Sequence, residues 1–317
     1  SIKNKKSKDI LIMEIERLLR ENRPNVRDTT INNYMLNLKK IYQGTGGKGV
    51  PSDLDFLKDI TKLNEYFKNI KTDTTRKNSI NVAIVFLMIL SKIEPKNKKI
   101  LKIIENLDLQ RTELNKNYTD NLKTNKKSEK QEKNWLSVEE IDNIANSYKN
   151  KDYQAYAIIK FHLGVPLRND LPSIKIMTKS KYNKLSEAEK KLTNAIVKTG
   201  ITDYALMMNN YKTSGAYMER QIDIPPSLNP IIRKLIKMNG ESGYLIVNPK
   251  TDKPFTTNEY TRYLNSLFKH TNKKISSTLL RNIVVSDKFG AITKEMKQTA
   301  KNMLHSSQTQ QGYIKTD

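Results

Sequence analysis

A polar segment at residues 115–134 is the feature that most constrains how this chain can fold. Its sequence, NKNYTDNLKTNKKSEKQEKN, has no hydrophobic periodicity and little to bury in a core. Such a composition is typical of a solvated linker. We therefore predict two structural units, residues 1–114 and residues 135–317, joined by a polar linker at residues 115–134.

The first unit is predicted to be helical. Apolar residues recur at helical spacing after the N-cap residues at 28–30, at Ile31, Tyr34, Leu38 and Ile41. Further apolar patterns predict helices around residues 54–63 and 74–93, the last dense enough for a buried central helix. The cluster GTGGKG at residues 44–49 lacks the complete phosphate-loop pattern and follows a helix, so we interpret it as a turn.

The second unit mixes helices with a few strands. A capping box at Ser137 and Glu140 starts a helix, and helices are also predicted at 152–164, 185–197, 230–238, 258–270, 276–288 and 294–304. Strands are predicted at 173–177, 203–211 and 219–224, the last two forming a hairpin around a turn at 213–215. The predicted fold class is mainly α with a small antiparallel β-sheet.

Composition excludes several kinds of site. The chain has no cysteine and only three histidines, His162, His270 and His305. These counts argue against a disulfide scaffold, a thiolate zinc site and a cysteine nucleophile, so we expect no metal and no cofactor. The longest apolar run, 82–90, is far shorter than the ~20 residues that cross a bilayer, and the first ten residues lack a signal-peptide core. We expect no membrane partner and an intracellular location.

The charge of the chain indicates a polyanionic partner. Fifty-seven Lys and Arg residues stand against 33 Asp and Glu, a formal net charge of +24. An excess of this size favours nucleic acid, although an AT-rich genome could also produce a lysine-rich composition. Charge alone does not separate a passive binder from an enzyme, because phosphate contacts position a protein without defining its reaction.

Five short motifs occur in an informative order. They are PLRND at 166–170, YKTSG at 211–215, TLLR at 278–281, MLHS at 303–306 and GYI at 312–314. In this order the sequence resembles the tyrosine recombinase/integrase family. Residues 1–110 resemble its helical core-binding domain and residues 135–317 its mixed α/β catalytic domain. The resemblance implies double-stranded DNA as the substrate and a homotetramer that acts on two DNA sites.

The resemblance also implies a role for each motif. Tyr313 would be the nucleophile, forming a covalent 3′-phosphotyrosyl link that conserves bond energy. Arg168 and Arg281 would clamp the non-bridging phosphate oxygens, which a guanidinium fork matches in geometry. Lys212 on the hairpin would protonate the 5′-oxygen leaving group, and His305 would donate a hydrogen bond to a phosphate oxygen. Fixed cations could then stabilise the transition state without a metal.

The chain departs from the family pattern at several positions. Thr278 occupies the place of the usual histidine in the His-x-x-Arg motif. The stretch between Arg168 and Lys212 is longer than usual, with the predicted helix at 185–197 as the insert. The spacing of eight residues from His305 to Tyr313 is about one shorter than in most members. Two alternatives therefore stay open: DNA relaxation by a type IB topoisomerase, and a DNA-binding relative without activity.

Overall fold

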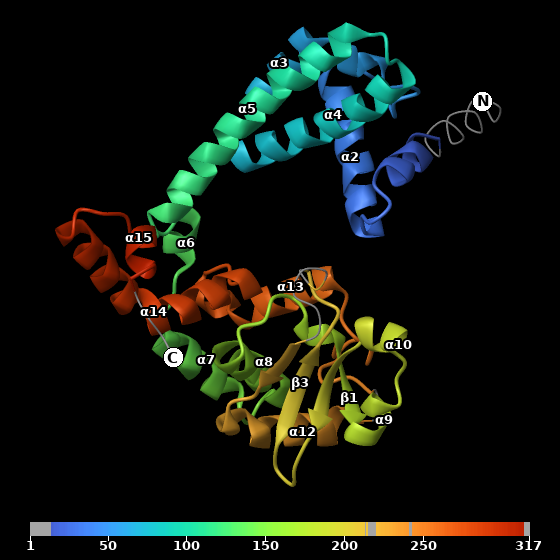
Figure 1. The fold of residues 1–317 in the computed structure, drawn as a ribbon. Coiled ribbons are helices and arrows are strands. Elements are labelled where there is room, and N and C mark those ends of the chain that lie inside the picture. The colour runs from blue at the N-terminus through green and yellow to red at the C-terminus, as the bar shows by residue number, and fades with distance from the viewer. Residues whose placement is uncertain (1–13, 213, 215–219, 241–242, 314–317) are drawn as a thin grey trace. The chain divides into compact units, whose positions relative to one another are not determined.

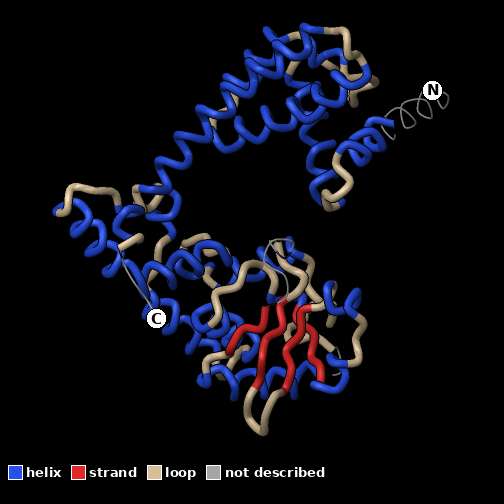
Figure 2. The backbone as a smooth tube through the Cα atoms, viewed as in Figure 1, coloured by secondary structure: helices blue, strands red, loops and turns tan. Residues whose placement is uncertain are grey.

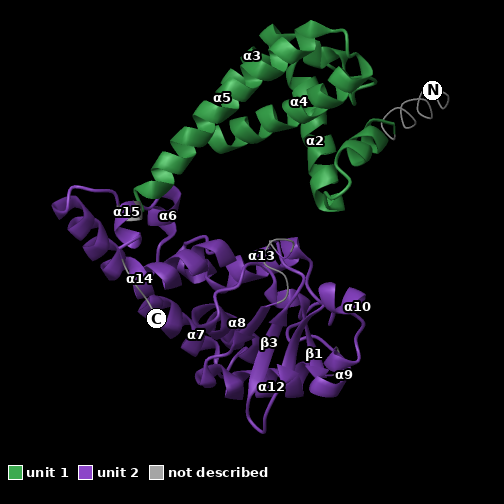
Figure 3. Cartoon of the chain, viewed as in Figure 1, with its two compact units in different colours: residues 1–126 green, residues 127–317 purple. Residues whose placement is uncertain are grey.

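The chain forms two compact units, each with its own core (Figure 3). A computed structural model describes residues 14–212, 214, 220–240 and 243–313. Unit 1 comprises residues 1–126 and unit 2 residues 127–317, so the division falls inside the segment for which the sequence predicts a linker.

Unit 1 is entirely helical in its described part, as the sequence predicts (Figure 1). After helical residues 14–22 come α2 (Asp28–Gly44), the 3₁₀ turn η1 (Asp55–Lys58), α3 (Ile60–Lys68), α4 (Asp73–Ile93) and α5 (Lys98–Lys123). The predicted stripe on α2 is buried at Ile31, Leu38 and Ile41. Most of α4 from residue 79 to residue 90 is buried, which makes it the central helix. Residues 45–50 form turns and bends rather than a helix or strand.

The polar segment 115–134 is more ordered than its composition suggests. Residues 115–123 continue α5, and α6 (Glu129–Asn134) follows a short break. Lysine, glutamate and glutamine are good helix formers, and a Lys123–Asp120 ion pair supports the last turn of α5. Ser128 and Gln131 form a capping box that starts α6. Local helix propensity therefore orders much of a segment that buries very little.

Unit 2 surrounds a small sheet with helices (Figures 1 and 2). Its helices are α6, α7 (Val138–Tyr148), α8 (Tyr153–Gly164), α9 (Lys179–Asn183), α10 (Glu187–Lys191), α12 (Asn229–Asn239), α13 (Thr257–Leu267), α14 (Ser277–Asn302) and α15 (Ser307–Gln311). Short 3₁₀ turns are η2 (Leu171–Ser173), η3 (Pro226–Leu228) and η5 (Lys269–Thr271). Eight of the twelve residues of α8 are buried, so it forms the centre of this unit.

The sheet has four strands in the order β1–β2–β3–β4. They are β1 (Ile174–Thr178), β2 (Asn194–Lys198), β3 (Tyr204–Met208) and β4 (Arg220–Asp223). The predicted hairpin is confirmed, because β3 and β4 pair antiparallel with Leu206 opposite Ile222. The predicted turn at 213–215 lies largely outside the described residues. The sheet is mixed rather than purely antiparallel, since β1 and β2 pair in parallel.

The two faces of the sheet have different partners. Ile174, Ile196 and Leu206 belong to the main core with the large helices. Ala195 and Val197 point the other way and pack with Tyr182 of α9. This alternation is the period of two expected for a strand that is covered on both faces.

Two predicted helices differ in the structure. The capping box at Ser186 and Glu189 does start a helix, but α10 ends at Lys191 and residues 194–198 form β2. Pairing of β2 with strands on both sides outweighs the helical tendency of this stretch. The predicted helices 276–288 and 294–304 are one continuous helix, α14. None of the described helices is both long and apolar enough to cross a membrane.

Candidate active site

Arg168 lies in a short loop directly after the central helix of unit 2. The helix α8 ends at Gly164. Pro166 follows two residues later and cannot continue the helical hydrogen bonds. The Val165 N–H still donates to the Phe161 carbonyl at 2.7 Å. The loop then places Pro166, Arg168 and Asp170 along a pocket of about 330 Å³.

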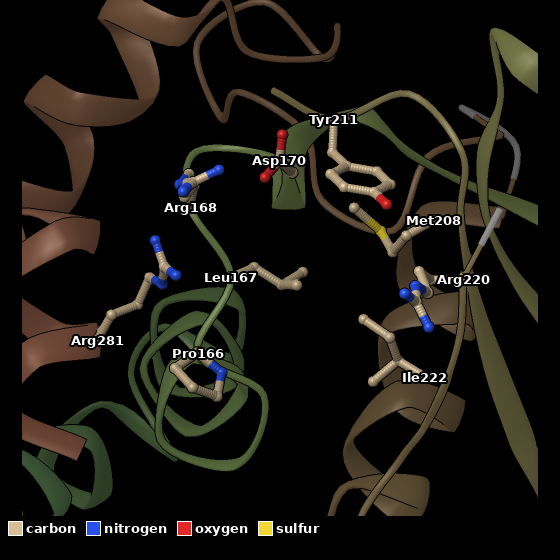
Figure 4. A pocket seen from close by; sticks show the side chains of 9 residues that line it. All are labelled: Pro166, Leu167, Arg168, Asp170, Met208, Tyr211, Arg220, Ile222 and Arg281. Atoms are coloured by element: carbon tan, nitrogen blue, oxygen red, sulfur yellow. The ribbon is translucent and has the colours of Figure 1, made fainter. Parts of the chain in front are cut away.

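Arg281 reaches the same pocket from α14 (Figure 4). The helix begins at the N-cap Ser276, whose hydroxyl accepts a hydrogen bond from the Leu279 N–H at 3.2 Å. Leu280 and Ile283 are buried in the core and fix the rotation of the helix about its axis. The direction in which Arg281 leaves the helix is therefore fixed, four residues after the first residue of α14.

The pocket is electrostatically suited to an anion. Figure 4 shows the guanidinium groups of Arg168 and Arg281 near one another, with the carboxylate of Asp170 beside Arg168. Burial lowers the pKa of Arg281 from its usual value, and the positive charge of Arg168 lowers it further, while Asp170 acts in the opposite direction. Because two close guanidinium groups repel one another, an anion that bridges them is stabilised.

The opposite wall of the pocket comes from the sheet. Met208 of β3, Arg220 and Ile222 of β4, and Tyr211 after β3 line it. Arg220 adds a third guanidinium to the pocket, a residue that the sequence analysis did not select. Lys212 is exposed in the connection between β3 and β4, next to Tyr211.

Asn169 connects the elements that carry the two arginines. Its Oδ1 accepts a hydrogen bond from the Ser277 hydroxyl at 2.7 Å, and its Nδ2 donates to Thr261 Oγ1 at 3.1 Å. Ser277 is only 4% exposed and lies one turn before Arg281 on α14. The amide of Asn169 thus ties the Arg168 loop to the start of α14 and to α13.

A buried histidine lies in the helix that precedes the arginine loop. His162 of α8 is fully buried, and its Nε2 is 2.7 Å from the Tyr260 hydroxyl of α13. Burial lowers the pKa of His162 to about 4, and the charge of Arg281 acts in the same direction. His162 is therefore neutral near pH 7, as a histidine in the core of unit 2.

His305 and Tyr313 come together at the other end of α14. Their ring centroids are 5.5 Å apart, with the short helix α15 between them in the chain. Tyr313 is 64% exposed, and its N–H donates to the Gln310 carbonyl at 2.9 Å. His305 Nδ1 is 3.1 Å from the Ser306 carbonyl, while its buried Nε2 has no partner among the described residues.

The turn between these helices has an unusual backbone. Leu304 has a φ of +58°, in the left-handed region, and its side chain is 94% exposed. The chain reverses at this turn, so that α15 packs against α14.

The predicted site residues therefore form two groups. Arg168 and Arg281 share the pocket, whereas His305 and Tyr313 share the far end of α14. Asn302 lies 21 positions after Arg281 in the same continuous helix, which at 1.5 Å per residue is about 30 Å. Thr278 is exposed, one turn before Arg281.

The fold has counterparts among solved structures. A variant of the Tn1549 transposon integrase in complex with transposon right end DNA matches with a TM-score of 0.54 at 15% identity, over 97% of this chain and 96% of that one. The same integrase in complex with circular intermediate DNA matches with a TM-score of 0.52 at 15% identity, over 88% and 87%. The chain has the tyrosine recombinase fold. No protein-family model matches the sequence, and a search of curated protein sequences found no match.

Within this tyrosine recombinase fold, two site residues escaped the sequence analysis. Arg220 is one of many basic residues, and only the pairing of β3 with β4 brings it to the pocket. Asn169 was visible between Arg168 and Asp170, but its partners come from distant helices. Within the described residues, no three His, Asp or Glu side chains gather as metal ligands.

Proposed function

We propose that this chain is a tyrosine recombinase that cuts and rejoins double-stranded DNA at specific sites, as in integration, excision or transposition of a mobile element. The observation that carries the proposal is the pocket in which Arg168 and Arg281 meet from distant parts of the sequence. A pair of guanidinium groups suits a phosphodiester, because each can bind two non-bridging oxygens. The matched fold of a DNA-bound transposon integrase supports the same assignment.

The proposed reaction is a transesterification at phosphorus. The exposed Tyr313 hydroxyl gives its proton to solvent, and its oxygen attacks the phosphorus, forming the phosphotyrosyl bond as the bond to the 5′-oxygen breaks. Lys212 donates a proton to that leaving oxygen. Arg168 and Arg281 stabilise the negative charge on the non-bridging oxygens, and His305 donates a hydrogen bond to one of them. Attack of a 5′-hydroxyl on the phosphotyrosyl bond reverses these steps and rejoins the strand, so no external energy source is needed.

The remaining charge of the chain would serve DNA binding. Most of the 57 Lys and Arg residues lie outside the pocket and would contact the phosphate backbone, giving an affinity that falls steeply with salt. Recombination between two DNA sites would use a homotetramer, in which each copy of the protein acts on one of the exchanged strands. Such a protein would work inside a cell, in contact with DNA.

A covalent-capture experiment tests the proposal. The protein is incubated with nicked duplexes that carry a randomised core, and denaturation-resistant protein–DNA adducts are isolated and sequenced. We expect the wild-type chain to form an adduct attached through Tyr313, in the presence of a chelator as well as in its absence. Tyr313→Phe should abolish the adduct and keep DNA binding, whereas Tyr118→Phe, at another exposed tyrosine, should change neither.

Variants of the arginines define the chemistry more closely. Arg281→Ala should lower the rate of adduct formation by ~10²–10³-fold, the usual effect of removing one group that stabilises transition-state charge. An adduct that persists in Tyr313→Phe would show that the nucleophile is another residue. DNA binding without any adduct would identify a binding protein that lacks catalysis, and relaxation of supercoiled plasmid at any sequence would identify a topoisomerase.

A further inference from the structure

The segment between β1 and β3 is built into the sheet beside the arginine pocket. It comprises α9, α10 and β2, residues 179–198, and it lies in the long stretch between Arg168 and Lys212. Its strand β2 is placed between β1 and β3, in parallel with the first and antiparallel to the second. We call it the 179–198 segment, and its contacts give it a role that the proposed reaction has not yet used.

The first residue of β2 is a buried asparagine whose amide uses every hydrogen bond available to it. Asn194 is 2% exposed, and its Oδ1 accepts hydrogen bonds from the N–H groups of Asn209 and Asn210 at 2.9 and 2.8 Å. Its Nδ2 donates to the Asn210 carbonyl and to the Ser173 hydroxyl, both at 2.8 Å. An asparagine amide has two N–H donors and an oxygen with two lone pairs, so this side chain is completely paired.

These four hydrogen bonds connect the two walls of the pocket. On one side, the Ser173 hydroxyl donates to the carbonyl of Asp170, a pocket residue in the loop after α8, at 2.6 Å. On the other side, residues 209 and 210 follow β3 and lead directly into Tyr211, which lines the pocket, and Lys212. One amide therefore joins the loop after α8 to the connection that carries the proposed general acid.

A second buried asparagine ties the same connection to the helices of the 179–198 segment. Asn209 is 6% exposed, and its Nδ2 donates to the Tyr182 hydroxyl of α9 at 2.8 Å and to the Lys190 carbonyl of α10 at 2.9 Å. Both helices and the strand of the segment thus hold the residues just after β3. Displacement of these residues would leave buried polar groups unpaired, which is costly where the dielectric constant is low.

We propose that Asn194 is a positioning residue for Lys212, and that the 179–198 segment keeps this lysine within reach of the 5′-oxygen leaving group. This inference rests on the proposed function. A general acid must lie within hydrogen-bond distance of the atom that it protonates. Lys212 is itself exposed, so its place depends on the backbone that precedes it, and the hydrogen bonds of Asn194 fix that backbone at residues 209 and 210.

The loop that carries Arg168 has supports that do not involve Asn194. The Ser173 N–H donates to the Asp170 carbonyl at 2.9 Å, and Asn169 connects the loop to α14. Loss of Asn194 should therefore disturb the general acid more than the phosphate clamp. The competing explanation is that Asn194 only stabilises the sheet, in which case its loss would slow the reaction of every substrate equally.

A substrate with a sulfur leaving group separates these explanations. When sulfur replaces the 5′-oxygen of the duplex that the wild-type chain captures, the phosphorus–sulfur bond breaks and releases a thiolate, which needs no proton because a thiol has a pKa of only ~8.5. Asn194→Ala should form the adduct ~10²-fold more slowly than wild type on the oxygen duplex, as expected for a lost general acid, and within about threefold of wild type on the sulfur duplex. Lys212→Ala should show the same pattern.

A conservative variant and a matched control complete this experiment. Tyr182→Phe removes one hydroxyl from the 179–198 segment and carries the test if Asn194→Ala does not fold; it should be about fivefold slower on the oxygen duplex and unchanged on the sulfur duplex. Asn229, also buried, donates to Asp203, which precedes β3 at the opposite end of the strand. Any loss in Asn229→Ala should be equal on both duplexes. Equal losses in Asn194→Ala, or in Tyr182→Phe in its place, would overturn the proposal.

Hydrogen exchange tests the connection without relying on catalysis. In Asn194→Ala the amide hydrogens of Asn209 and Asn210 should exchange about tenfold faster than in wild type, because both lose their acceptor. Asn229→Ala should leave these rates unchanged. Unchanged exchange in Asn194→Ala would overturn the connection even if wild type forms adducts. A wild-type chain that forms no adduct on either duplex would instead contradict the proposed function, and the exchange rates would still decide whether Asn194 holds this backbone.

Discussion

The N-terminal part of α14 belongs to the core of unit 2, whereas every residue from 285 to 292, in the middle of the same helix, is exposed. Leu280 and Ile283 are buried at one end, while Phe289 and Tyr313 are largely exposed toward the other. The arginine pocket is held by packing and by the Asn169 hydrogen bonds. Tyr313 is held mainly by a short helix that contacts α14.

This contrast separates two requirements of the proposed chemistry. Groups that stabilise charge must be fixed before the reaction, because a preorganised site needs no reorganisation in the transition state. A nucleophile that must reach a phosphate can instead be presented on an extended element. The predictions below test whether the two ends of α14 differ in this way, from the largest expected effect to the smallest.

Truncation of apolar side chains should affect the two ends very differently. Leu280→Ala should lower the free energy of unfolding of unit 2 by about 2–5 kcal/mol, because it leaves a cavity in the core. Phe289→Ala should change it by only about 0.5 kcal/mol in the isolated chain. The unfolding free energies of both variants can be measured by denaturant titration, followed by the fluorescence of Trp135, the single tryptophan. Similar losses for the two variants would contradict the contrast.

The stability of the core that surrounds the N-terminal part of α14 should also depend on pH, through His162 of α8. The pKa of His162 is about 4 in the folded chain, against ~6.5 when unfolded. Below pH ~6.5 the unfolded chain binds a proton that the folded chain does not, so stability falls as the pH drops from about 6.5 to about 4. The loss attributable to His162 is roughly 3 kcal/mol. His162→Gln should remove this part of the pH dependence in Trp135 titrations, and His270→Gln, at an exposed histidine, should retain it.

Loss of the amide that connects the arginine elements should have a smaller effect. Asn169→Ala leaves the buried Ser277 hydroxyl without its acceptor, which should cost about 1–3 kcal/mol. The rate of adduct formation at saturating DNA should fall while DNA affinity changes little, because Asn169 positions the arginines and does not bind DNA itself. Asn265→Ala, a neighbouring amide on α13, is the control. Strictly additive effects of Asn169→Ala and Ser277→Ala would contradict the direct connection.

The smallest effect should come from the exposed middle of α14, residues 285–292. An added Cβ at Gly290 meets no atom within 4 Å, and the residue is helical. Gly290→Ala should therefore stabilise the distal half of α14 by about 0.5–1 kcal/mol. Slower hydrogen exchange of amides on both sides of residue 290 would show this, and unchanged exchange would indicate that the helix is not continuous there.

Much of the local structure followed from the sequence. The sequence predicts a helix at 152–164, a strand at 173–177 and a hairpin around 213–215, which correspond to α8, β1 and the β3–β4 pair. The order of the motifs indicated that Arg168 and Arg281 act together, and the structure places them in one pocket. These features depend on neighbouring residues or on a resemblance that spans the chain.

The features that escaped prediction depend on tertiary context. Residues 194–198 read as helix after the capping box, and only strands on both sides make them β2. The sequence predicts two helices, 276–288 and 294–304, yet α14 is continuous from Ser277 to Asn302, with Gly290 inside it. The separation of Arg281 from the far end of α14 follows directly from that continuity, so the order of the motifs along the chain did not reveal it.

The turn at Leu304 has a consequence for how firmly Tyr313 is held. A leucine in the left-handed region carries a backbone strain of roughly 1 kcal/mol, and its exposed side chain gains no compensating burial. That strain is released when Leu304 returns to an ordinary conformation, which would unfold the reversal between α14 and α15. The strain therefore lowers, by about the same amount, the net free energy with which this turn holds Tyr313 beside His305.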